Sequence, residues 1–314
     1  MIEWLDSAHR MSDWGSVRAV VDGLDERGFS AADVLLDLGA NVIVLSETQS
    51  DKAKLLEVLG ADVRGDASLP PCDLLIAAAP SPVVDQAGAR GVPVWSDVEL
   101  AWRLQDRVVP WLGVTGSASV SATAAMAEAM LHAGGLTVSA VGANQRPIVE
   151  TIMDGEQYDV LVVAMSKFTL TDDSPVRFHS AVVRSVADDD GSDEIYARVY
   201  YQVTHSCVYN VAEPRTEAMV EQADVVEGAR AIGFTWGIPA MSMMGVVDEL
   251  LVDRAFIPQR RDSALEVASV ADVPTGSPEM IGNALAAAGL ARSFGVPATA
   301  VRDGLRAYGS KGET

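Results

Sequence analysis

The sequence predicts an α/β protein built on parallel sheets and divided into two domains. Short, uninterrupted β-branched runs such as 41–45 are typical of strands that are buried on both faces. These runs alternate with helical segments along the chain, as expected for repeated strand–helix units. The length of 314 residues is sufficient for two domains with separate cores.

The first part of the chain is expected to contain strands at 19–24, 41–45, 72–78 and 92–95, with helices ending near Gly39 and at 52–59, 83–89 and 97–104. Gly23 and Gly28 resemble parts of a glycine-rich phosphate-binding turn. Because carboxylates lie between them, an ordinary strand-to-helix turn is favoured. Glu47 follows the second strand, where an acidic residue could hold a ribose or uracil. The alternative is a solvated loop carboxylate.

The stretch 108–131 has the pattern of a phosphate-binding loop: a strand at 108–114, a small-residue loop at 115–121 and a helix that starts near Ser121. We expect Ser119 or Ser121 to cap this helix. A working loop ends in glycine, lysine and a hydroxyl residue. Ser119 and Val120 occupy the glycine and lysine positions, and Ser121 keeps the hydroxyl. An ordinary strand-to-helix turn is the competing interpretation.

The remainder continues the α/β pattern, and the two domains, 1–107 and 108–314, should join near 106–110. A hairpin is predicted at 243–255, with its turn near Asp248 and Glu249. The other expected strands are 138–141, 160–165, 180–186, 207–211 and 265–270, and the expected helices are 213–223, 278–294 and 298–308.

Composition and charge restrict the function. The formal net charge of −21, from 23 basic and 44 acidic side chains, repels nucleic acids and anionic membrane surfaces. The two cysteines are too few for a disulfide framework, and the N-terminus does not resemble a signal peptide. We therefore expect a cytoplasmic protein without a nucleic-acid or membrane partner. Its oligomeric state is left open.

The order of motifs resembles the Mur ligase family, most closely the members that add D-glutamate to UDP-N-acetylmuramoyl-L-alanine. The segments that carry the resemblance include WLGVTGSASVSATAAMAEAMLHAGG, VGANQRPIVE, YDVLVVAMSKFTL and GSPEMIGNALAAAGLARSFGVPATAVRDGLRAY. The resemblance implies a Rossmann-like domain (1–107) for the UDP end of the substrate and a P-loop-type central ATPase domain (108–314). It implies ATP and Mg²⁺ as cofactors, and UDP-N-acetylmuramoyl-L-alanine as substrate. The family's third, C-terminal domain is expected to be absent.

The same resemblance assigns site residues. The family pattern T-G-T-N-G-K-[ST]-[ST] falls on 115–122, with Thr115, Gly116 and Ser121 matching and Ser117 conservative. These four, together with Asn283, are the candidate nucleotide contacts, and Ser121 is also the possible metal ligand. The candidate substrate contacts are Gly142 and Ser166.

Other positions depart from the family pattern. Ala164 replaces the glutamate that binds magnesium, and Lys167 lies nearby. The family's metal-binding histidine segment corresponds roughly to VADDDGSDE at 186–194, which has no histidine. Its aspartates at 188–190 could bind a cation or be a solvated charge run. The carbamylated lysine falls at Tyr196, and the G-x-H-N stretch reads Ser277 to Met280. Because these changes lie at ligand positions, we expect an inactive or severely impaired ligase. The alternatives are a non-catalytic binding module and a ligand-free scaffold.

Overall fold

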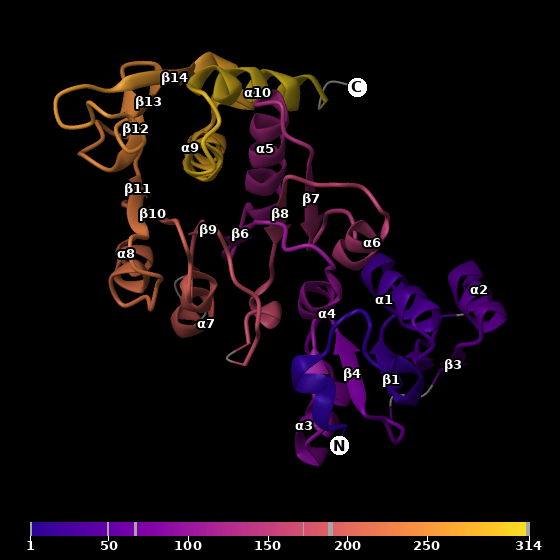
Figure 1. The fold of residues 1–314 in the computed structure, drawn as a ribbon. Coiled ribbons are helices and arrows are strands. Elements are labelled where there is room, and N and C mark those ends of the chain that lie inside the picture. The colour runs from indigo at the N-terminus through magenta and orange to yellow at the C-terminus, as the bar shows by residue number, and fades with distance from the viewer. Residues whose placement is uncertain (1, 49, 66–67, 172, 188–190, 312–314) are drawn as a thin grey trace. The chain divides into compact units, whose positions relative to one another are not determined.

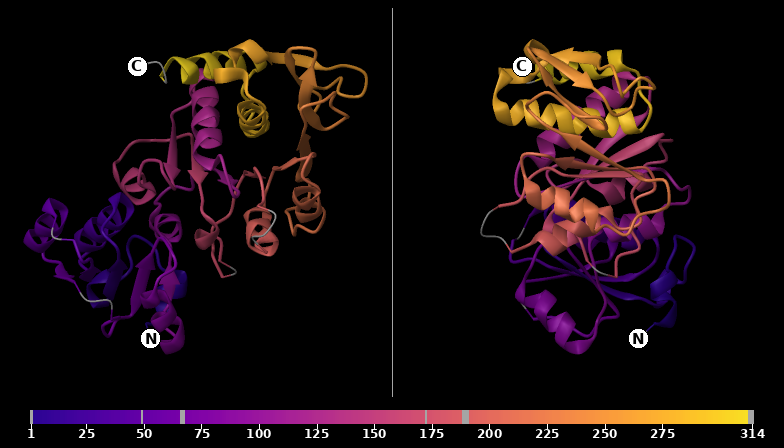
Figure 2. Two further views of the ribbon diagram at one scale, coloured as in Figure 1. Left: turned by 180° about the vertical axis from the view of Figure 1, so that it is seen from behind. Right: turned by 90° about the vertical axis from the view of Figure 1, so that its left-hand side faces the viewer.

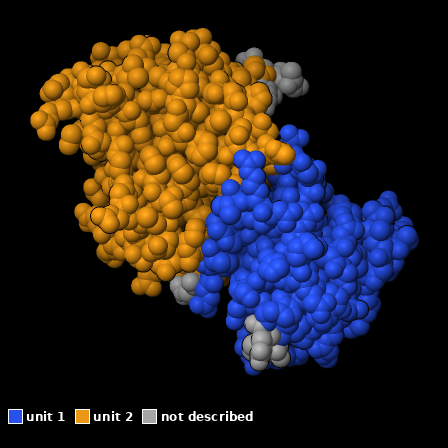
Figure 3. Space-filling view, viewed as in Figure 1, with its two compact units in different colours: residues 1–108, 146–156, 173–176 blue, residues 109–145, 157–172, 177–314 orange. Residues whose placement is uncertain are grey.

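The computed structural model describes residues 2–48, 50–65, 68–171, 173–187 and 191–311. The chain forms two compact units, which are coloured separately in Figure 3. Unit 1 consists of residues 1–108, 146–156 and 173–176, and unit 2 consists of residues 109–145, 157–172 and 177–314. Two short segments that follow the boundary at residue 108, 146–156 and 173–176, therefore pack with unit 1.

Unit 1 contains a five-stranded sheet in the order β3-β2-β1-β4-β5, and all its neighbouring strands are parallel (Figure 1). Side chains of Asp25, Ser50, Ser81 and Ser96 cap the helices that follow the strands. The elements are β1 (Arg18–Asp22), α1 (Glu26–Asp37), β2 (Asn41–Leu45), α2 (Asp51–Leu59), β3 (Asp62–Arg64), β4 (Leu74–Ala77), α3 (Pro82–Arg90), β5 (Val94–Trp95), α4 (Asp97–Leu104) and α6 (Ile148–Met153).

Unit 2 contains a nine-stranded sheet in the order β14-β13-β12-β11-β10-β9-β6-β8-β7. Strands β7 to β12 run parallel with β6, and the β12–β13 and β13–β14 pairs are antiparallel. The elements are β6 (Trp111–Thr115), α5 (Val120–Ala133), β7 (Val138–Gly142), β8 (Val160–Ala164), β9 (Ser180–Val183), α7 (Asp193–Ala197), β10 (Ser206–Asn210), α8 (Pro214–Glu221), β11 (Arg230–Phe234), β12 (Met243–Val247), β13 (Leu250–Asp253), β14 (Leu265–Ser269), α9 (Pro278–Ser293) and α10 (Ala298–Lys311).

The core of unit 2 lies between this sheet and three helices. Helix α9 packs against α5 and against β9 to β12, and α10 packs against α5 (Figures 1 and 2). The long alanine run of α9 is fully buried, which allows its backbone to approach both the sheet and α5. Met126 and Met130 of α5 complete the same cluster. This packing fixes the start of α5 and of α9 at the carboxyl edge of the sheet.

The predicted fold class is confirmed: both units are α/β, with a parallel sheet in unit 1 and a mostly parallel sheet in unit 2. The prediction that 108–114 forms an interior strand is confirmed in position, because β6 lies between β8 and β9. Its start was predicted three residues too early. Val108 is 81% exposed, and Pro110 has no backbone N–H to donate to a neighbouring strand.

The predicted hairpin is also confirmed, with β12 and β13 paired around Asp248 and Glu249. Two strands and two helices were missed: β3, β11, α6 and α7. No helix among the described residues is both long and apolar enough to cross a membrane.

Candidate functional site

The loop after β6 is held by the end of β9. The backbone N–H of Arg184 donates to the carbonyl of Thr115 at 2.8 Å, and the N–H of Ser117 donates to the carbonyl of Ser185 at 2.9 Å. Gly116, at φ 142°, lies between these bonds, and a Cβ there would be 2.8 Å from the Ser185 carbonyl oxygen. Backbone contacts with the end of β9 therefore fix the shape of the loop.

Helix α5 begins at Val120, which confirms the predicted helix start near Ser121. The predicted side-chain cap is wrong. Ser119 occupies the N-cap position at φ 60°, a left-handed conformation that glycine favours, and its hydroxyl donates to Glu279 Oε1 at 2.5 Å rather than accepting from the helix. The Ser121 hydroxyl faces the carbonyl of Ala143 at 3.4 Å. Ser119 thus has the left-handed backbone conformation that a glycine would adopt, and its hydroxyl holds the carboxylate of Glu279 beside the loop.

The other matched hydroxyls of the loop form internal hydrogen bonds. Thr115 is fully buried, and its Oγ1 donates to the carbonyl of Met165 at 3.1 Å. The Ser117 hydroxyl lies 3.2 Å from that of Ser185 and is exposed. Of the two, only Ser117 is accessible to a ligand.

The positions expected to supply a cation and a metal ligand are apolar. Val120 packs against the hydrophobic core of unit 2, and Ala164, 1% exposed, is part of that core. Lys167 Nζ donates to the Ser192 hydroxyl at 3.3 Å. Within the described ranges, no group of three or more His, Cys, Asp or Glu side chains is arranged to hold a metal ion. The aspartates at 188–190 lie outside the described residues.

Asn283, the remaining nucleotide candidate, is engaged by Arg184, which sequence reasoning missed. Arg184 is 5% exposed, its Nε donates to Asn283 Oδ1 at 2.6 Å, and its other guanidinium end donates to the carbonyl of Glu279 at 3.2 Å. The guanidinium also lies 5.9 Å from the Trp236 ring centre. Burial lowers the pKa of Arg184. An arginine directly after the buried run 180–183 was the available sequence signal.

The two substrate candidates lie at the ends of neighbouring strands. Gly142 ends β7, where a Cβ would be 2.3 Å from the carbonyl oxygen of Ala164, so close strand packing already requires glycine. Ser166 follows β8, and its hydroxyl is buried without a hydrogen-bond partner among the described residues. Ser166 is therefore the candidate whose polar group is still unsatisfied.

No family model matches the chain. Curated proteins do match over most of its length. It is 45% identical to the UDP-N-acetylmuramoylalanine–D-glutamate ligase of Streptomyces avermitilis over 318 residues, which cover 95% of this chain and 68% of that protein. The same ligase of Streptomyces coelicolor is 45% identical over 320 residues, with the same coverage. The chain belongs to the Mur ligase family.

Solved structures show the same fold. The UDP-N-acetylmuramate:L-alanyl-γ-D-glutamyl-meso-diaminopimelate ligase from Neisseria meningitides superposes with a TM-score of 0.59 at 17% identity, over 93% of this chain and 98% of that one. A murein peptide ligase from Psychrobacter arcticus gives a TM-score of 0.58 at 12% identity, over 93% of this chain and 68% of that one. At these identities the likeness supports the Mur ligase fold alone.

In unit 1, the side chain of Asp25 occupies the turn after β1. Asp25 Oδ1 accepts from the backbone N–H of Gly28 at 2.8 Å, so a carboxylate already caps the first helix. Glu47 is exposed. Sequence reasoning missed Asp97, which is buried 3.6 Å from the Nε of Arg27 and whose pKa is raised by burial.

In unit 2, Tyr196, at the position of the carbamylated lysine, is buried at 3% exposure.

Proposed function

We propose that this chain is a Mur ligase scaffold that does not form the amide bond at enzyme rates. By resemblance, it derives from ligases that join D-glutamate to UDP-N-acetylmuramoyl-L-alanine, with residues 1–107 as the UDP-substrate domain and 108–314 as the ATPase-type domain. The observation that carries the proposal is the apolar surroundings of two positions: Ala164 is buried in the core, and the partly buried Val120 packs against it. These are the positions where the family places a lysine and a magnesium ligand.

The residues present do not fit ATP and Mg²⁺. Phosphoryl transfer depends on cations placed around the phosphate oxygens. At the loop, Val120 carries no charge, and the Glu279 carboxylate is bound to Ser119. The hydroxyl of Ser121, the candidate metal ligand, donates to a carbonyl oxygen instead. A net charge of −21 adds unfavourable long-range electrostatics for a polyanion.

The expected loss of rate is large. Removal of one preorganised group that stabilises transition-state charge commonly costs about 10²–10³ in kcat, or roughly 3–4 kcal/mol. If the lysine and the carboxylate act independently, losing both lowers the rate by about 10⁴–10⁶. Such a loss would take an ordinary turnover of about 10 per second to less than one per minute.

A second candidate function is binding of UDP-N-acetylmuramoyl-L-alanine without catalysis. The unsatisfied, buried hydroxyl of Ser166 favours it, because a buried polar group without a partner is costly and a ligand would relieve that cost. A ligand-free scaffold is the alternative outcome.

Two measurements test these proposals. Phosphate release from Mg-ATP, with UDP-N-acetylmuramoyl-L-alanine and D-glutamate present, should stay at background; turnover on the order of 1 per second would overturn the first proposal. Calorimetric titration with the UDP-sugar should show binding that Ser166→Ala weakens, while Ser310→Ala, an exposed serine on α10, leaves it unchanged. Absence of binding to the unmodified chain would favour the ligand-free scaffold.

A further inference from the structure

A pocket lies in unit 2 at the edge of the sheet opposite the loop after β6. It has a volume of about 460 Å³, within the range of small-molecule sites. Its lining includes Arg230, the first residue of β11, and His205, which immediately precedes β10. Ser293, the last residue of α9, also lines it. Because β10 and β11 are parallel to β6, the pocket is at the amino ends of the strands and is separate from the nucleotide-loop position.

Three arginines contribute to this pocket, in a chain that is strongly acidic overall. Arg292 is neutralised, since its Nε donates to the fully buried carboxylate of Asp253 at 2.9 Å. Arg230 donates to the carbonyl of Ala255 at 2.5 Å and has no ion pair with a described carboxylate. Arg260 makes neither a side-chain hydrogen bond nor an ion pair within the described part of the chain. Two positive charges are therefore left without a paired carboxylate.

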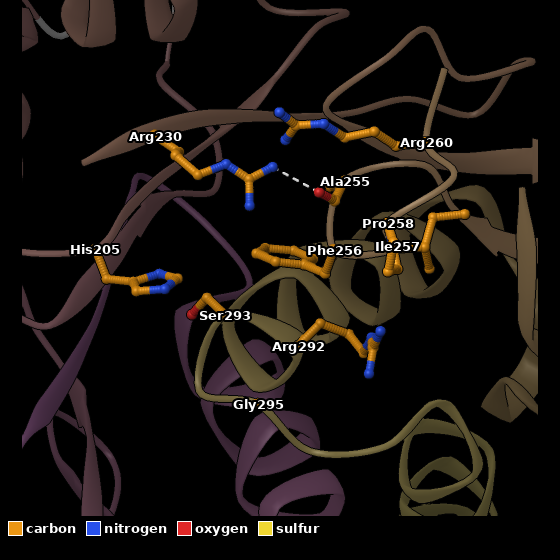
Figure 4. Close-up of a pocket in the computed structure, with 10 residues that line it drawn as sticks. All are labelled: His205, Arg230, Ala255, Phe256, Ile257, Pro258, Arg260, Arg292, Ser293 and Gly295. Atoms are coloured by element: carbon orange, nitrogen blue, oxygen red, sulfur yellow. Dashed lines mark hydrogen bonds between the residues drawn. The ribbon is translucent and has the colours of Figure 1, made fainter. Parts of the chain in front are cut away.

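These two charges converge. In Figure 4 the guanidinium of Arg230 lies beside Ala255, the guanidinium of Arg260 is drawn just above it, and that of Arg292 lies below Phe256 and points away. Burial, and then the nearby charge of Arg260, lowers the pKa of Arg230, and the carboxylate of Asp253, which is paired with Arg292, offsets this only in part. Like charges placed together repel, and an anion between them would remove that repulsion. Guanidinium groups also match the oxygens of phosphate in a two-pronged geometry.

The pocket has an apolar wall as well as a charged rim. The centre of the Phe256 ring lies 5.3 Å from the guanidinium carbon of Arg230, and Ile257 and Pro258 continue the apolar wall. A free phosphate would contact only the charged part of a pocket of this volume. An organic group attached to the phosphate would also cover the Phe256 ring and bury apolar surface.

We propose that this pocket binds a small phosphate dianion, with Arg230 and Arg260 on the phosphate oxygens and Phe256 against its organic part. A phosphomonoester carries close to two negative charges at neutral pH, which matches the two unpaired guanidinium groups. The ligand is a phosphomonoester of a small molecule, and inorganic phosphate is the minimal form of the same chemistry.

The test is calorimetric titration of the full chain with phenyl phosphate, inorganic phosphate and benzoate. Phenyl phosphate should bind saturably, and Arg260→Ala should weaken it by about tenfold or more, as expected for the loss of a charged hydrogen bond. Arg261→Ala removes the same charge from the next, exposed residue, which does not line the pocket, and should change the affinity by less than about twofold. An unchanged melting temperature of Arg260→Ala shows that the variant is folded.

The three probes separate the sources of the anion. Tighter binding of phenyl phosphate than of inorganic phosphate assigns the pocket to a phosphomonoester, and equal binding assigns it to free phosphate. The proposal is overturned if phenyl phosphate fails to saturate by about 10 mM, which is weaker than a specific small-molecule site. It is also overturned if benzoate binds as tightly, or if Arg261→Ala has the same effect as Arg260→Ala.

Discussion

Replacement of Gly116 by alanine tests whether the shape of the loop after β6 comes from the chain itself. At φ 142° a non-glycine residue is strained by about 1–3 kcal/mol. The new Cβ would also lie 2.8 and 2.9 Å from the backbone oxygen and nitrogen of Ser185, which cannot move without disturbing the end of β9. Alanine gains about 0.4–1 kcal/mol through lower entropy of the unfolded chain. Steric crowding of this kind typically costs about a further 1–3 kcal/mol. We therefore expect a net destabilisation of at least about 1 kcal/mol.

Gly135→Ala is the matched control. Gly135 also has positive φ, at 86°, but nothing lies within 4 Å of its added Cβ, so only the backbone strain remains. The two variants differ by the steric crowding, about 1–3 kcal/mol. Melting followed by circular dichroism should therefore place Gly116→Ala about 2–12 °C below Gly135→Ala, since 1 kcal/mol shifts the melting temperature of a domain of this size by about 2–4 °C. If the two variants melt within about 1 °C of each other, the loop is not fixed by its contact with β9.

Three further predictions concern binding, packing and pH. Val120→Lys combined with Ala164→Glu should bring Mg-ATP binding into the range measurable by calorimetry; no gain would show that these two positions do not control affinity. Asp253→Ala should destabilise the protein by about 3 kcal/mol in urea unfolding, because it leaves the partly buried Arg292 without its carboxylate, and a loss below about 1 kcal/mol would contradict this. Burial lowers the pKa of His179 from 6.5 to about 4, so unfolding takes up a proton and stability falls as the pH drops from 6.5 towards 4. His179→Leu should reduce the difference in melting temperature between about pH 7 and about pH 5.

The fold could be predicted where local pattern and burial agree. The run 41–45 is β-branched throughout, and β2 has the predicted bounds. Strand β11 was missed because its sequence RAIGF combines an arginine, an alanine and a glycine with only two large apolar residues. The glycine of that strand, Gly233, packs against Val211, a contact that no local pattern reveals.

The site was less predictable, since its contacts join distant parts of the chain. Ser119 has the residue type of a helix cap, but its left-handed backbone directs the hydroxyl to Glu279, 160 residues away in sequence. Asn283 matches the family pattern, and yet its side chain is held by Arg184, 99 residues away. A motif identifies the residue type at a position and gives no information on the partner that the fold supplies.

This difference has a consequence for how a retained motif residue contributes to binding. A polar side chain stabilises a bound ligand in two cases. Its polar group has no hydrogen-bond partner before binding, or its hydrogen bond to the ligand is stronger than the one that it gives up. For Asn283 to turn to a nucleotide, the buried guanidinium of Arg184 would lose an acceptor at a cost of about 1.5–3 kcal/mol, which is roughly 10- to 150-fold in affinity. The same argument applies to Thr115, whose hydroxyl is bonded within the core. In this protein, matched residues therefore support the scaffold. Ligand binding is expected at Ser166, whose hydroxyl has no hydrogen-bond partner among the described residues, and at the Arg230–Arg260 pair, whose charges have no ion pair there.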